Sequence, residues 1–304
     1  MTYAKKVYKI DHTIAEAVTL KKEIYKIRGE NIMSIKKGIA LTLAAVATCA
    51  TMGMATACGE QKETLIVYTE AGFAPWEFTK KGSTKVVGVD MEIAKYIADK
   101  YDWELNVING NFDAIVAGIK EDNALGIAGI SYSESRANAV EFSSFYWEDA
   151  YQAVVYETES NPTITDGTFA VSNFEGAKLV CQTGTTSQMT VMENKDIWNY
   201  ANTADFSQVV AALEDMKTSS GKEYLIVDSQ VAAQLAAEDP ALSYAQIEGM
   251  EAEKYGVVAK KGNSELIDKV NAALAELLTD DANGKNQIEK WFDEYSVVAD
   301  EEGE

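Results

Sequence analysis

Apolar and polar positions along residues 65–150 follow two different periods, which predicts strands and helices in turn. Val89, Ile93 and Ile97 recur every fourth residue, as on the buried face of an amphipathic helix. Short apolar runs before and after this helix indicate strands. The pattern predicts three strands joined by two helices, with strands at 65–68, 103–108 and 125–130 and helices at 91–100 and 112–119. This order is typical of a right-handed parallel α/β layer.

The same kind of pattern starts again after residue 150. It predicts strands at 151–156, 178–182, 224–227 and 255–259, and helices at 186–192, 205–217, 229–237, 264–279 and 283–295. In the 205–217 helix, four apolar side chains share one face: Phe206, Val209, Val210 and Leu213. The chain therefore contains two α/β layers. We expect residues 298–304 to form a frayed acidic tail.

Polar side chains follow four of the predicted strands. In open α/β sheets, ligands bind where the carboxyl ends of strands meet the N-termini of helices. This rule directs attention to the loops after Tyr68, Ile130, Gln182 and Val227. A ligand site is therefore expected where these four loops meet.

The side chains in these loops match the two charges of an amino acid. Arg136 and a helix N-terminus at Thr185 and Thr186 suit a carboxylate. Separate carboxylates at Glu70 and Asp228 suit an ammonium group. Together they predict a site for a zwitterion. For the two threonines and for Asp228, the alternative is a helix cap without a ligand role.

Arg136 is singled out by composition. It is the only arginine after residue 57, where the other 17 basic residues are lysines. A guanidinium binds a carboxylate through two parallel hydrogen bonds, a geometry that lysine cannot imitate. A lone arginine among lysines therefore indicates a geometric need, and the alternative is an ordinary surface cation.

Charge excludes some partners and is unevenly spread. The chain carries 27 basic and 48 acidic residues, a formal net charge of −21, and 47% of its residues are apolar. Nine of the basic and four of the acidic residues lie in residues 1–57, so the remainder holds 18 against 44. Such a surface repels nucleic acid and anionic lipid head groups. The part after residue 58 has no histidine and one cysteine, Cys181, so neither a disulfide framework nor a zinc-type cluster is predicted.

Residues 33–57 have the composition of a secretory signal. Two lysines follow Met33, residues 39–57 are almost uncharged, and small residues lead to Cys58. The 55–58 boundary is similar to a lipobox, in which the cysteine is lipidated and becomes the first residue. Ala55 stands where leucine is usual, and an ordinary signal peptidase cutting before Cys58 is the alternative. We expect a lipid anchor at Cys58 and a short leader over 58–64.

Residues 1–32 do not fit a signal sequence, because they would make the leader unusually long. We expect translation to start at Met33. The alternative is a genuine N-terminal extension starting at Met1.

Five short motifs occur in order along the chain: residues 67–78, residues 87–94, residues 128–136 with 140–143, residues 182–186, and residues 289–292. They read Val-Tyr-Thr-Glu-Ala-Gly-Phe-Ala-Pro-Trp-Glu-Phe, Val-Gly-Val-Asp-Met-Glu-Ile-Ala, Ala-Gly-Ile-Ser-Tyr-Ser-Glu-Ser-Arg with Val-Glu-Phe-Ser, Gln-Thr-Gly-Thr-Thr, and Glu-Lys-Trp-Phe. By these motifs the chain resembles the family 3 solute-binding proteins, the polar amino-acid receptors of ABC importers. The resemblance runs from about residue 65 to residue 297. In the first motif Glu70 replaces a frequent aspartate.

The resemblance implies a role for each candidate residue. Arg136, with Thr185 and Thr186, would hold the ligand's carboxylate, and Ser131 would contact the head group on its carboxylate or ammonium side. The ammonium would be met by Asp228, Glu70 and the carbonyl of Gly129. The ligand's side chain would face Phe73, Phe112 and Gln182, although aromatic residues at such positions can simply be core.

The resemblance also implies the fold and the mode of action. It implies a two-lobed periplasmic-binding-protein type II fold, each lobe a mainly parallel sheet flanked by helices. Lobe 1 would comprise residues 65–146 and 256–297, and lobe 2 residues 147–255. The lobes would close on a polar or charged amino acid by a hinge near 146–150 and 253–257. A permease would then take it from a monomeric receptor on the outer face of the membrane.

Two other functions use the same fold. A dehydratase-like enzyme could use carboxylates as acid and base, but Glu70 and Asp228 are better explained by an ammonium group. The chain could also be the sensor domain of a receptor, although no further domain follows residue 297. We therefore expect binding without catalysis and without a metal or cofactor. The sequence leaves the identity of the amino acid open.

Overall fold

The computed structural model describes residues 62–301 of the chain. The expectations for residues 1–32, for the signal at 33–57 and for Cys58 lie outside the described residues. Within the described range, no helix is long and apolar enough to cross a membrane.

The first sheet has five strands in the order β4-β1-β5-β14-β6. Its strands are β1 (Thr64–Thr69), β4 (Glu104–Asn109), β5 (Ala124–Gly126), β6 (Val140–Ala150) and β14 (Glu253–Lys260). The three strands predicted for the first layer, β1, β4 and β5, pair in parallel. The other two, β14 and β6, are antiparallel to their neighbours. This sheet is therefore mixed, with a parallel half that the sequence predicted.

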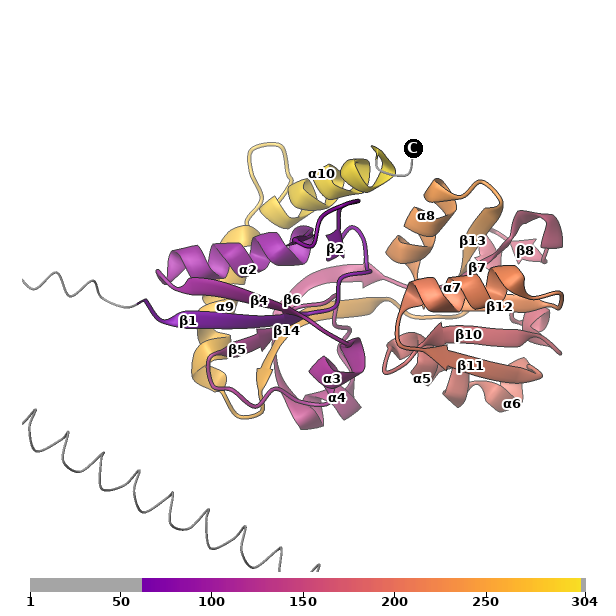
Figure 1. Ribbon diagram of the computed structural model, residues 1–304, viewed down its shortest axis with the longest axis horizontal. Helices are drawn as coiled ribbons and strands as arrows, with labels where there is room; N and C mark the ends of the chain where they lie inside the picture. Colours follow the sequence, from indigo (N-terminus) through magenta and orange to yellow (C-terminus); the bar gives the residue numbers. More distant parts are fainter. Residues whose placement is uncertain (1–61, 302–304) are drawn as a thin grey trace, which may run out of the picture. The chain divides into compact units, whose positions relative to one another are not determined.

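Helices cover both faces of the first sheet (Figure 1). The helices attached to it are α2 (Val89–Lys100), α3 (Phe112–Val116), α4 (Glu134–Ala139), α9 (Ser264–Leu277) and α10 (Gln287–Glu301). One face packs against α2, α9 and α10, through fully buried side chains such as Ile93, Ile97 and Val270. The other face packs against Phe112 and Ile115 of α3.

The second sheet has seven strands in the order β11-β10-β12-β7-β13-β9-β8. Its strands are β7 (Gln152–Glu157), β8 (Ile164–Thr165), β9 (Thr168–Phe169), β10 (Lys178–Gln182), β11 (Asn202–Phe206), β12 (Glu223–Asp228) and β13 (Leu242–Ile247). Here β11, β10 and β12 pair in parallel, and β7 is antiparallel to both β12 and β13. All six residues of β12 are buried, as expected for a strand covered on both faces.

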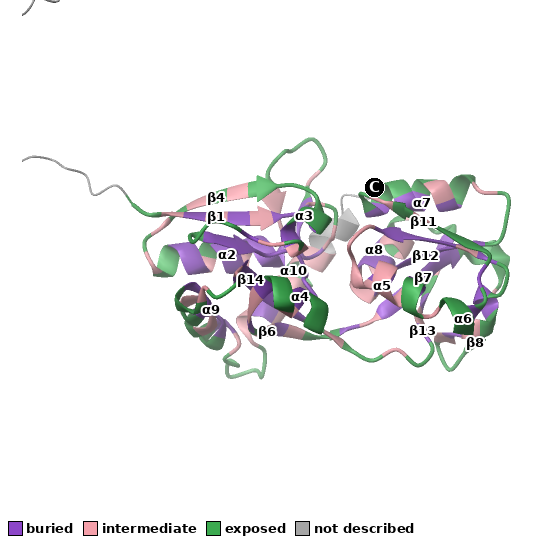
Figure 2. Ribbon diagram, turned by 90° about the horizontal axis from the view of Figure 1, so that it is seen from below, coloured by how far each residue is buried: buried purple, intermediate pink, exposed green. Residues whose placement is uncertain are grey.

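Two pairs of helices cover the second sheet. They are α5 (Thr186–Glu193) with α6 (Lys195–Trp198), and α7 (Val209–Thr218) with α8 (Ser229–Glu238). The first pair packs with Phe169, Phe174 and Leu179 on one face, and the second pair packs on the other face. Figure 2 shows the buried strands between helices whose outer sides are exposed. Short elements complete the chain: β2 (Phe78–Thr79) with β3 (Val86–Val87), and the 3-10 turns at Thr158–Ser160 and Val171–Phe174.

The chain passes between the two sheets along paired strands. Near the crossing, β6 and β14 pair antiparallel, with Ala150 opposite Glu253 and Trp147 opposite Tyr255. The register shifts three times between Glu253 and Val258, which marks bulges or irregularities in this pairing. The two segments expected to form a hinge are therefore hydrogen-bonded to each other.

Several predicted elements are corrected. The helix predicted over 205–217 is wrong at its start, because β11 occupies 202–206 and α7 begins only at Val209. Phe206 consequently lies on a strand, and Val210 is 58% exposed instead of buried. The strand predicted over 125–130 ends at Gly126, and the helix predicted over 112–119 ends at Val116. The last helix continues to Glu301, into the segment expected to fray, and residues 302–304 lie outside the described residues.

Several elements were not predicted, among them α4, α6, β6, β11 and β13 and the short strands β2, β3, β8 and β9. The burial pattern of β6 does not alternate residue by residue, so its sequence lacks the signal of a half-buried strand. Its pairing with β14, more than 100 residues later, makes it a strand.

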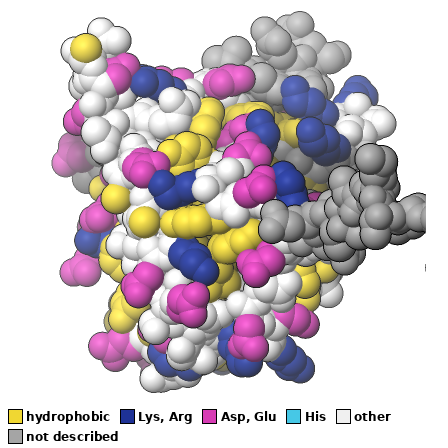
Figure 3. Space-filling view, turned by 90° about the vertical axis from the view of Figure 1, so that its left-hand side faces the viewer, with side chains coloured by type: hydrophobic (Ala, Val, Ile, Leu, Met, Phe, Trp, Pro, Cys, Tyr) yellow, Lys and Arg dark blue, Asp and Glu magenta, His cyan; other side chains and the backbone are white. Residues whose placement is uncertain are grey.

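Charged side chains of both signs are interspersed on the surface. The face in Figure 3 shows basic side chains among aspartates and glutamates, with apolar patches between them. Lys260 pairs with Asp122 at 2.7 Å, and Lys254 pairs with Glu148 at 2.6 Å. Such exposed pairs contribute about 1 kcal/mol or less each, so the stability of the fold depends mainly on the four apolar cores.

Candidate functional site

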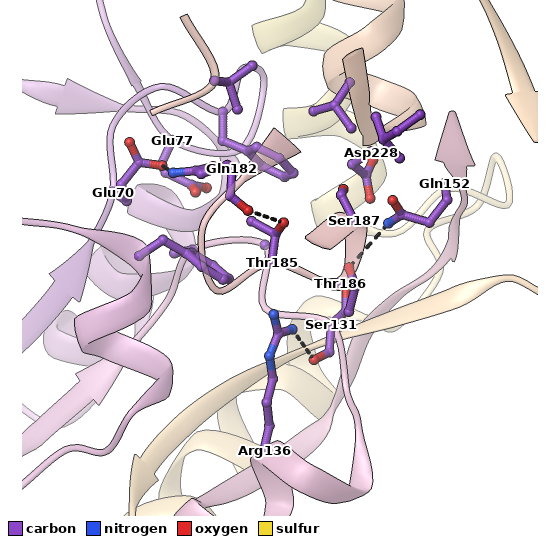
Figure 4. A pocket seen from close by; sticks show the side chains of 17 residues that line it. Glu70, Glu77, Ser131, Arg136, Gln152, Gln182, Thr185, Thr186, Ser187 and Asp228 are labelled. Carbon is purple, nitrogen blue, oxygen red and sulfur yellow. Dashed lines mark hydrogen bonds between the residues drawn. The ribbon is translucent and has the colours of Figure 1, made fainter. Parts of the chain in front are cut away.

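A pocket lies among the loops that the sequence singled out. Its lining residues come from both sheets: Glu70, Phe73, Glu77, Phe112, Ala128, Gly129, Ser131, Arg136, Gln152, Gln182, Thr185, Thr186, Ser187, Val209, Ile226, Val227 and Asp228. All ten predicted ligand-contacting residues are in this set. The space between them that the centres of water molecules can occupy is about 30 Å³, so side chains from both sheets nearly fill the pocket. Figure 4 shows the polar side chains converging on this space.

Arg136 is buried with its charge toward the pocket. It belongs to α4, whose first turn is capped by the side chain of Ser133, which accepts a hydrogen bond from the Arg136 N–H. The guanidinium donates from Nη1 to the carbonyl of Ser131 at 2.7 Å and from Nη2 to the carbonyl of Gly184 at 2.9 Å. It also lies over the ring of Phe112, 5.3 Å from the ring centre.

Only 5% of Arg136 is exposed, which makes an ordinary surface cation the wrong interpretation. Burial lowers its pKa to about 10, so it stays charged at neutral pH. Within the described residues, its Nε–H is buried without a hydrogen-bond partner and no carboxylate forms a salt bridge with it. The arrangement therefore offers a desolvated positive charge to an anionic group.

The N-terminus of α5 faces the same space. Thr185 caps this helix, because its hydroxyl accepts a hydrogen bond from the Gln188 N–H at 3.2 Å and donates one to the Gln182 carbonyl at 2.7 Å. Thr186 donates its hydroxyl to Glu253 at 2.9 Å. A helix N-terminus attracts negative charge, so this end of the pocket suits a carboxylate.

Asp228 ends β12 and caps α8. One carboxyl oxygen accepts the Gln230 N–H at 3.1 Å, and the other accepts the hydroxyl of Tyr255. Asp228 thus caps the helix, as the alternative expected, and the same carboxyl group also lines the pocket, so a ligand role stays a prediction. Burial raises the pKa of Asp228 to about 7, because removing a carboxylate from water disfavours its charged form.

Glu70 and Gln182 lie together at another part of the pocket. Gln182 Nε2 donates to Glu70 Oε2 at 3.1 Å, which joins the loop after β1 to the end of β10. Glu70 is only 4% exposed, and burial raises its pKa. Its carboxyl group is therefore held in place and poorly solvated, a state in which a cationic partner is favourable.

Gly129 occupies a position that tolerates no side chain. Its φ is +51°, and a Cβ there would lie 2.7 Å from Cε1 of Phe73. Its N–H donates to Asp90 at 2.8 Å, which fixes the turn before Ser131. Phe73 and Phe112 both line the pocket, as predicted for residues facing a ligand side chain.

The sequence missed several pocket residues, including Glu77, Gln152 and Ser187. Glu77 is 1% exposed, and its pKa is raised well above the usual range by burial and by the charge of Asp90. Its position within the 67–78 motif could have identified Glu77 as a pocket residue from the sequence. Gln152 donates to Thr186 at 3.2 Å and to Glu253 at 2.7 Å, contacts that no local pattern predicts.

Known proteins are similar to this chain in sequence and in fold. The family model of bacterial extracellular solute-binding proteins, family 3, matches residues 65–294. The arginine-binding extracellular protein ArtP of Bacillus subtilis (strain 168) is 25% identical over 255 residues, covering 81% of this chain and 95% of ArtP.

Solved structures agree with this assignment. An ancestral arginine-binding protein, solved with arginine and with glutamine, is 29% identical with a TM-score of 0.65, covering 77% of this chain and 98% of that chain. AbpA of Streptococcus pneumoniae Canada MDR_19A, solved with L-arginine, shares the fold with a TM-score of 0.68 at 24% identity, covering 78% and 95% of the two chains. These relatives are named as binding proteins, not as enzymes. The expected two-lobed type II fold is confirmed, and the chain belongs to the bacterial extracellular solute-binding proteins of family 3.

Proposed function

We propose that this chain captures an amino acid with a cationic side chain and delivers it to an ABC importer. The observation that carries the proposal is the charge distribution of the pocket. One buried guanidinium, Arg136, is faced by a helix N-terminus, and two separate carboxyl groups, Glu70 and Asp228, lie in other loops. The third carboxyl group of the lining, Glu77, has a pKa raised well above the usual range by burial, which favours its neutral form. An amino acid with a basic side chain has the complementary set of one negative and two positive charges.

The carboxylate of the ligand would bind at Arg136. The guanidinium could donate from two nitrogens, and the N-terminus of α5 at Thr185 and Thr186 would add backbone N–H groups. Ser131 would contribute its hydroxyl from beside the carbonyl that already accepts from Arg136. This end recognises the part common to all amino acids.

The α-ammonium group would bind at Asp228 and the carbonyl of Gly129. A positive charge beside Asp228 favours the ionised form of this carboxyl group, which burial alone disfavours. Binding of the ammonium group therefore favours ionisation of Asp228, and ionised Asp228 binds the ammonium group more tightly.

The ligand's side chain would lie between Phe73 and Phe112 and end at Glu70, beside Gln182. Glu70 would then bind a second positive group and not the α-ammonium, because Glu70 is hydrogen-bonded to Gln182, whereas Asp228 lies on the side of Ser187 and Thr186 in Figure 4. Arginine is the ligand named for ArtP and for the ancestral protein, which supports this choice. Glutamine is the second candidate, since the ancestral protein was also solved with it.

A thermal-shift screen of the 20 amino acids, cystine and citrulline tests the proposal on protein starting at Gly59. Citrulline has the shape of arginine without its charge. Ligand binding raises the melting temperature by mass action, so we expect arginine to raise it more than citrulline does. If citrulline and glutamine match arginine, the cationic choice is wrong, and if no amino acid acts, so is amino-acid capture.

Capture would proceed by hinge closure. Residues 65–146 with 256–297 would form one lobe and residues 147–255 the other, with the hinge at the paired segments of β6 and β14. The ligand favours the closed form because groups of both lobes contact it only there. A permease would then accept the ligand from the closed, monomeric receptor.

A lipid at Cys58 would hold the receptor at the outer face of the membrane after removal of the signal at 33–57. Detergent phase partitioning of the protein made in a bacterial host tests this anchor. We expect the processed wild type in the detergent phase and Cys58→Ala in the aqueous phase, whereas equal partitioning would contradict lipidation.

A further inference from the structure

The strand β14, which runs from the crossing into the first sheet, contacts both halves of the pocket. Its backbone is tied to the loop that carries Ser131. Gly256 donates its N–H to the carbonyl of Ile130 at 3.0 Å, and Tyr132 donates its N–H to the carbonyl of Lys254 at 2.8 Å. Its side chains reach the second sheet instead, so one short segment connects the two sets of ligand-binding loops.

Tyr255 makes one of these side-chain contacts. It is fully buried, with its ring against Trp76 at a centroid distance of 5.2 Å. Its hydroxyl donates to Oδ2 of Asp228, while Oδ1 of the same carboxyl group accepts from Gln230. The orientation of Asp228 is therefore fixed from two sides.

Glu253 makes the other contact. Its carboxylate accepts from Thr186 Oγ1 at 2.9 Å and from Gln152 Nε2 at 2.7 Å. Both donors line the pocket, although Glu253 itself does not. Thr186 is the first residue of α5, so Glu253 fixes the helix terminus that faces Arg136.

We infer that Tyr255 and Glu253 are positioning residues of the pocket, by which the Tyr255 hydroxyl orients the carboxyl group of Asp228 and Glu253 holds Thr186 at the carboxylate end. The inference rests on the proposed binding of an amino acid. It assigns a binding role to a strand of the first sheet, whereas Asp228 ends a strand of the second sheet and Thr186 begins a helix packed on that sheet.

The two residues act on the charge of Asp228 in opposite directions. The hydroxyl of Tyr255 lowers the pKa of Asp228, and so does the N–H of Gln230, whereas the negative charge of Glu253 raises it. Burial is the largest influence and raises it to about 7. Glu77 and Arg136 also face this group across the pocket.

The experiment is a pH series of ligand affinity by calorimetry, from about pH 5.5 to about pH 7.5, below the usual α-amino pKa of about 7.7–8.0, so that the ligand's α-ammonium stays mostly protonated. The probe is L-arginine, or L-glutamine if the thermal screen favours it. Wild-type affinity should rise with pH as Asp228 ionises. Tyr255→Phe should move this rise to higher pH and weaken binding about tenfold at pH 7. Glu253→Gln should move it to lower pH.

Tyr200→Phe is the matched control, because its buried hydroxyl donates at 3.2 Å to the carbonyl of Val191, away from the pocket. Its pH profile should coincide with that of the wild type. Unmoved profiles for both variants, or displacements in the same direction, would overturn the inference. If circular dichroism shows that Tyr255→Phe does not fold, the Glu253→Gln variant tests the inference alone. A displacement of its affinity profile to lower pH supports the inference, and any other result overturns it. A wild type that binds no amino acid refutes the proposed function instead.

Discussion

Arg136 Nη2 lies 2.9 Å from the carbonyl oxygen of Gly184, so the arginine that follows the first sheet's β5 contacts the turn that follows the second sheet's β10. The second guanidinium nitrogen, Nη1, donates to Ser131 in its own loop. The two groups of loops are thus joined by the residue best suited to bind a carboxylate. Changes at either end of this hydrogen bond should alter ligand binding.

Replacing Arg136 by lysine should weaken amino-acid binding by at least about 2 kcal/mol, since charge-assisted hydrogen bonds from a planar guanidinium are lost. Calorimetry with L-arginine measures the effect. Agmatine, which is arginine without its carboxylate, provides the control. Its weaker binding should be equal in the wild type and Arg136→Lys, and an equal loss for both ligands would mean that Arg136 does not read the carboxylate.

Replacing Glu70 by glutamine should reduce discrimination between arginine and citrulline. The variant keeps the size of the side chain and removes its charge, so the Kd for arginine should rise about tenfold or more. The Kd for citrulline should change little. Competition binding of the two ligands to wild type and variant measures the ratio. An unchanged ratio would remove Glu70 from the side-chain end of the pocket.

Replacing Gly184 by alanine should impair both stability and binding. Its φ is +78°, and a Cβ there would lie 2.9 Å from Cβ of Asp113. Positive φ alone costs an alanine about 1–2 kcal/mol. The collision with Asp113 would also move the Gly184 carbonyl, which accepts a hydrogen bond from Arg136, away from α3. Gly167→Ala is the matched control, because φ is +81° and nothing lies within 4 Å of the added Cβ. Chemical denaturation should show a loss for both variants, whereas only Gly184→Ala should raise the Kd.

The free energy of unfolding of the ligand-free protein should fall as pH rises from about 5 to about 8. Burial raises the pKa of Asp90 to about 6 and that of Asp228 to about 7. The folded state therefore keeps protons that unfolded carboxyl groups, with pKa near 4, have already released. This stabilisation is complete at low pH and is lost as pH passes through the folded pKa values.

Urea denaturation at several pH values measures the slope, and Asp90→Asn should reduce it. Asp281→Asn is the control, since hydrogen bonds led by the one from Lys290 lower the pKa of Asp281 to about 2. Its stabilisation is present above the unfolded pKa and is lost only as pH falls toward 2, so the slope between about pH 5 and about pH 8 should stay unchanged. If the free energy of unfolding of the wild type rises over this range, the folded state does not hold the extra protons expected on Asp90 and Asp228.

Local sequence patterns predicted the elements that carry the site. Helix α2 follows its apolar pattern closely because it buries one periodic face against one core, and strands β1, β10 and β12 are short apolar runs that each pack between two cores. Most of the residues predicted to contact a ligand were found because they follow strands whose carboxyl ends share an edge. Arg136 was found because it is a lone arginine among lysines.

The sequence by itself thus determined the two α/β layers, the family motifs and the ten residues now brought together in one pocket. Tertiary structure decided the antiparallel partners β6 and β13, the strand at 202–206 in place of a helix, and the contacts of Tyr255 and Glu253 with Asp228 and Thr186. The physical reason is distance along the chain. A helix or a covered strand is recognised from neighbours a few residues away, whereas strand pairing and the orientation of a buried carboxyl group depend on partners that only folding brings near.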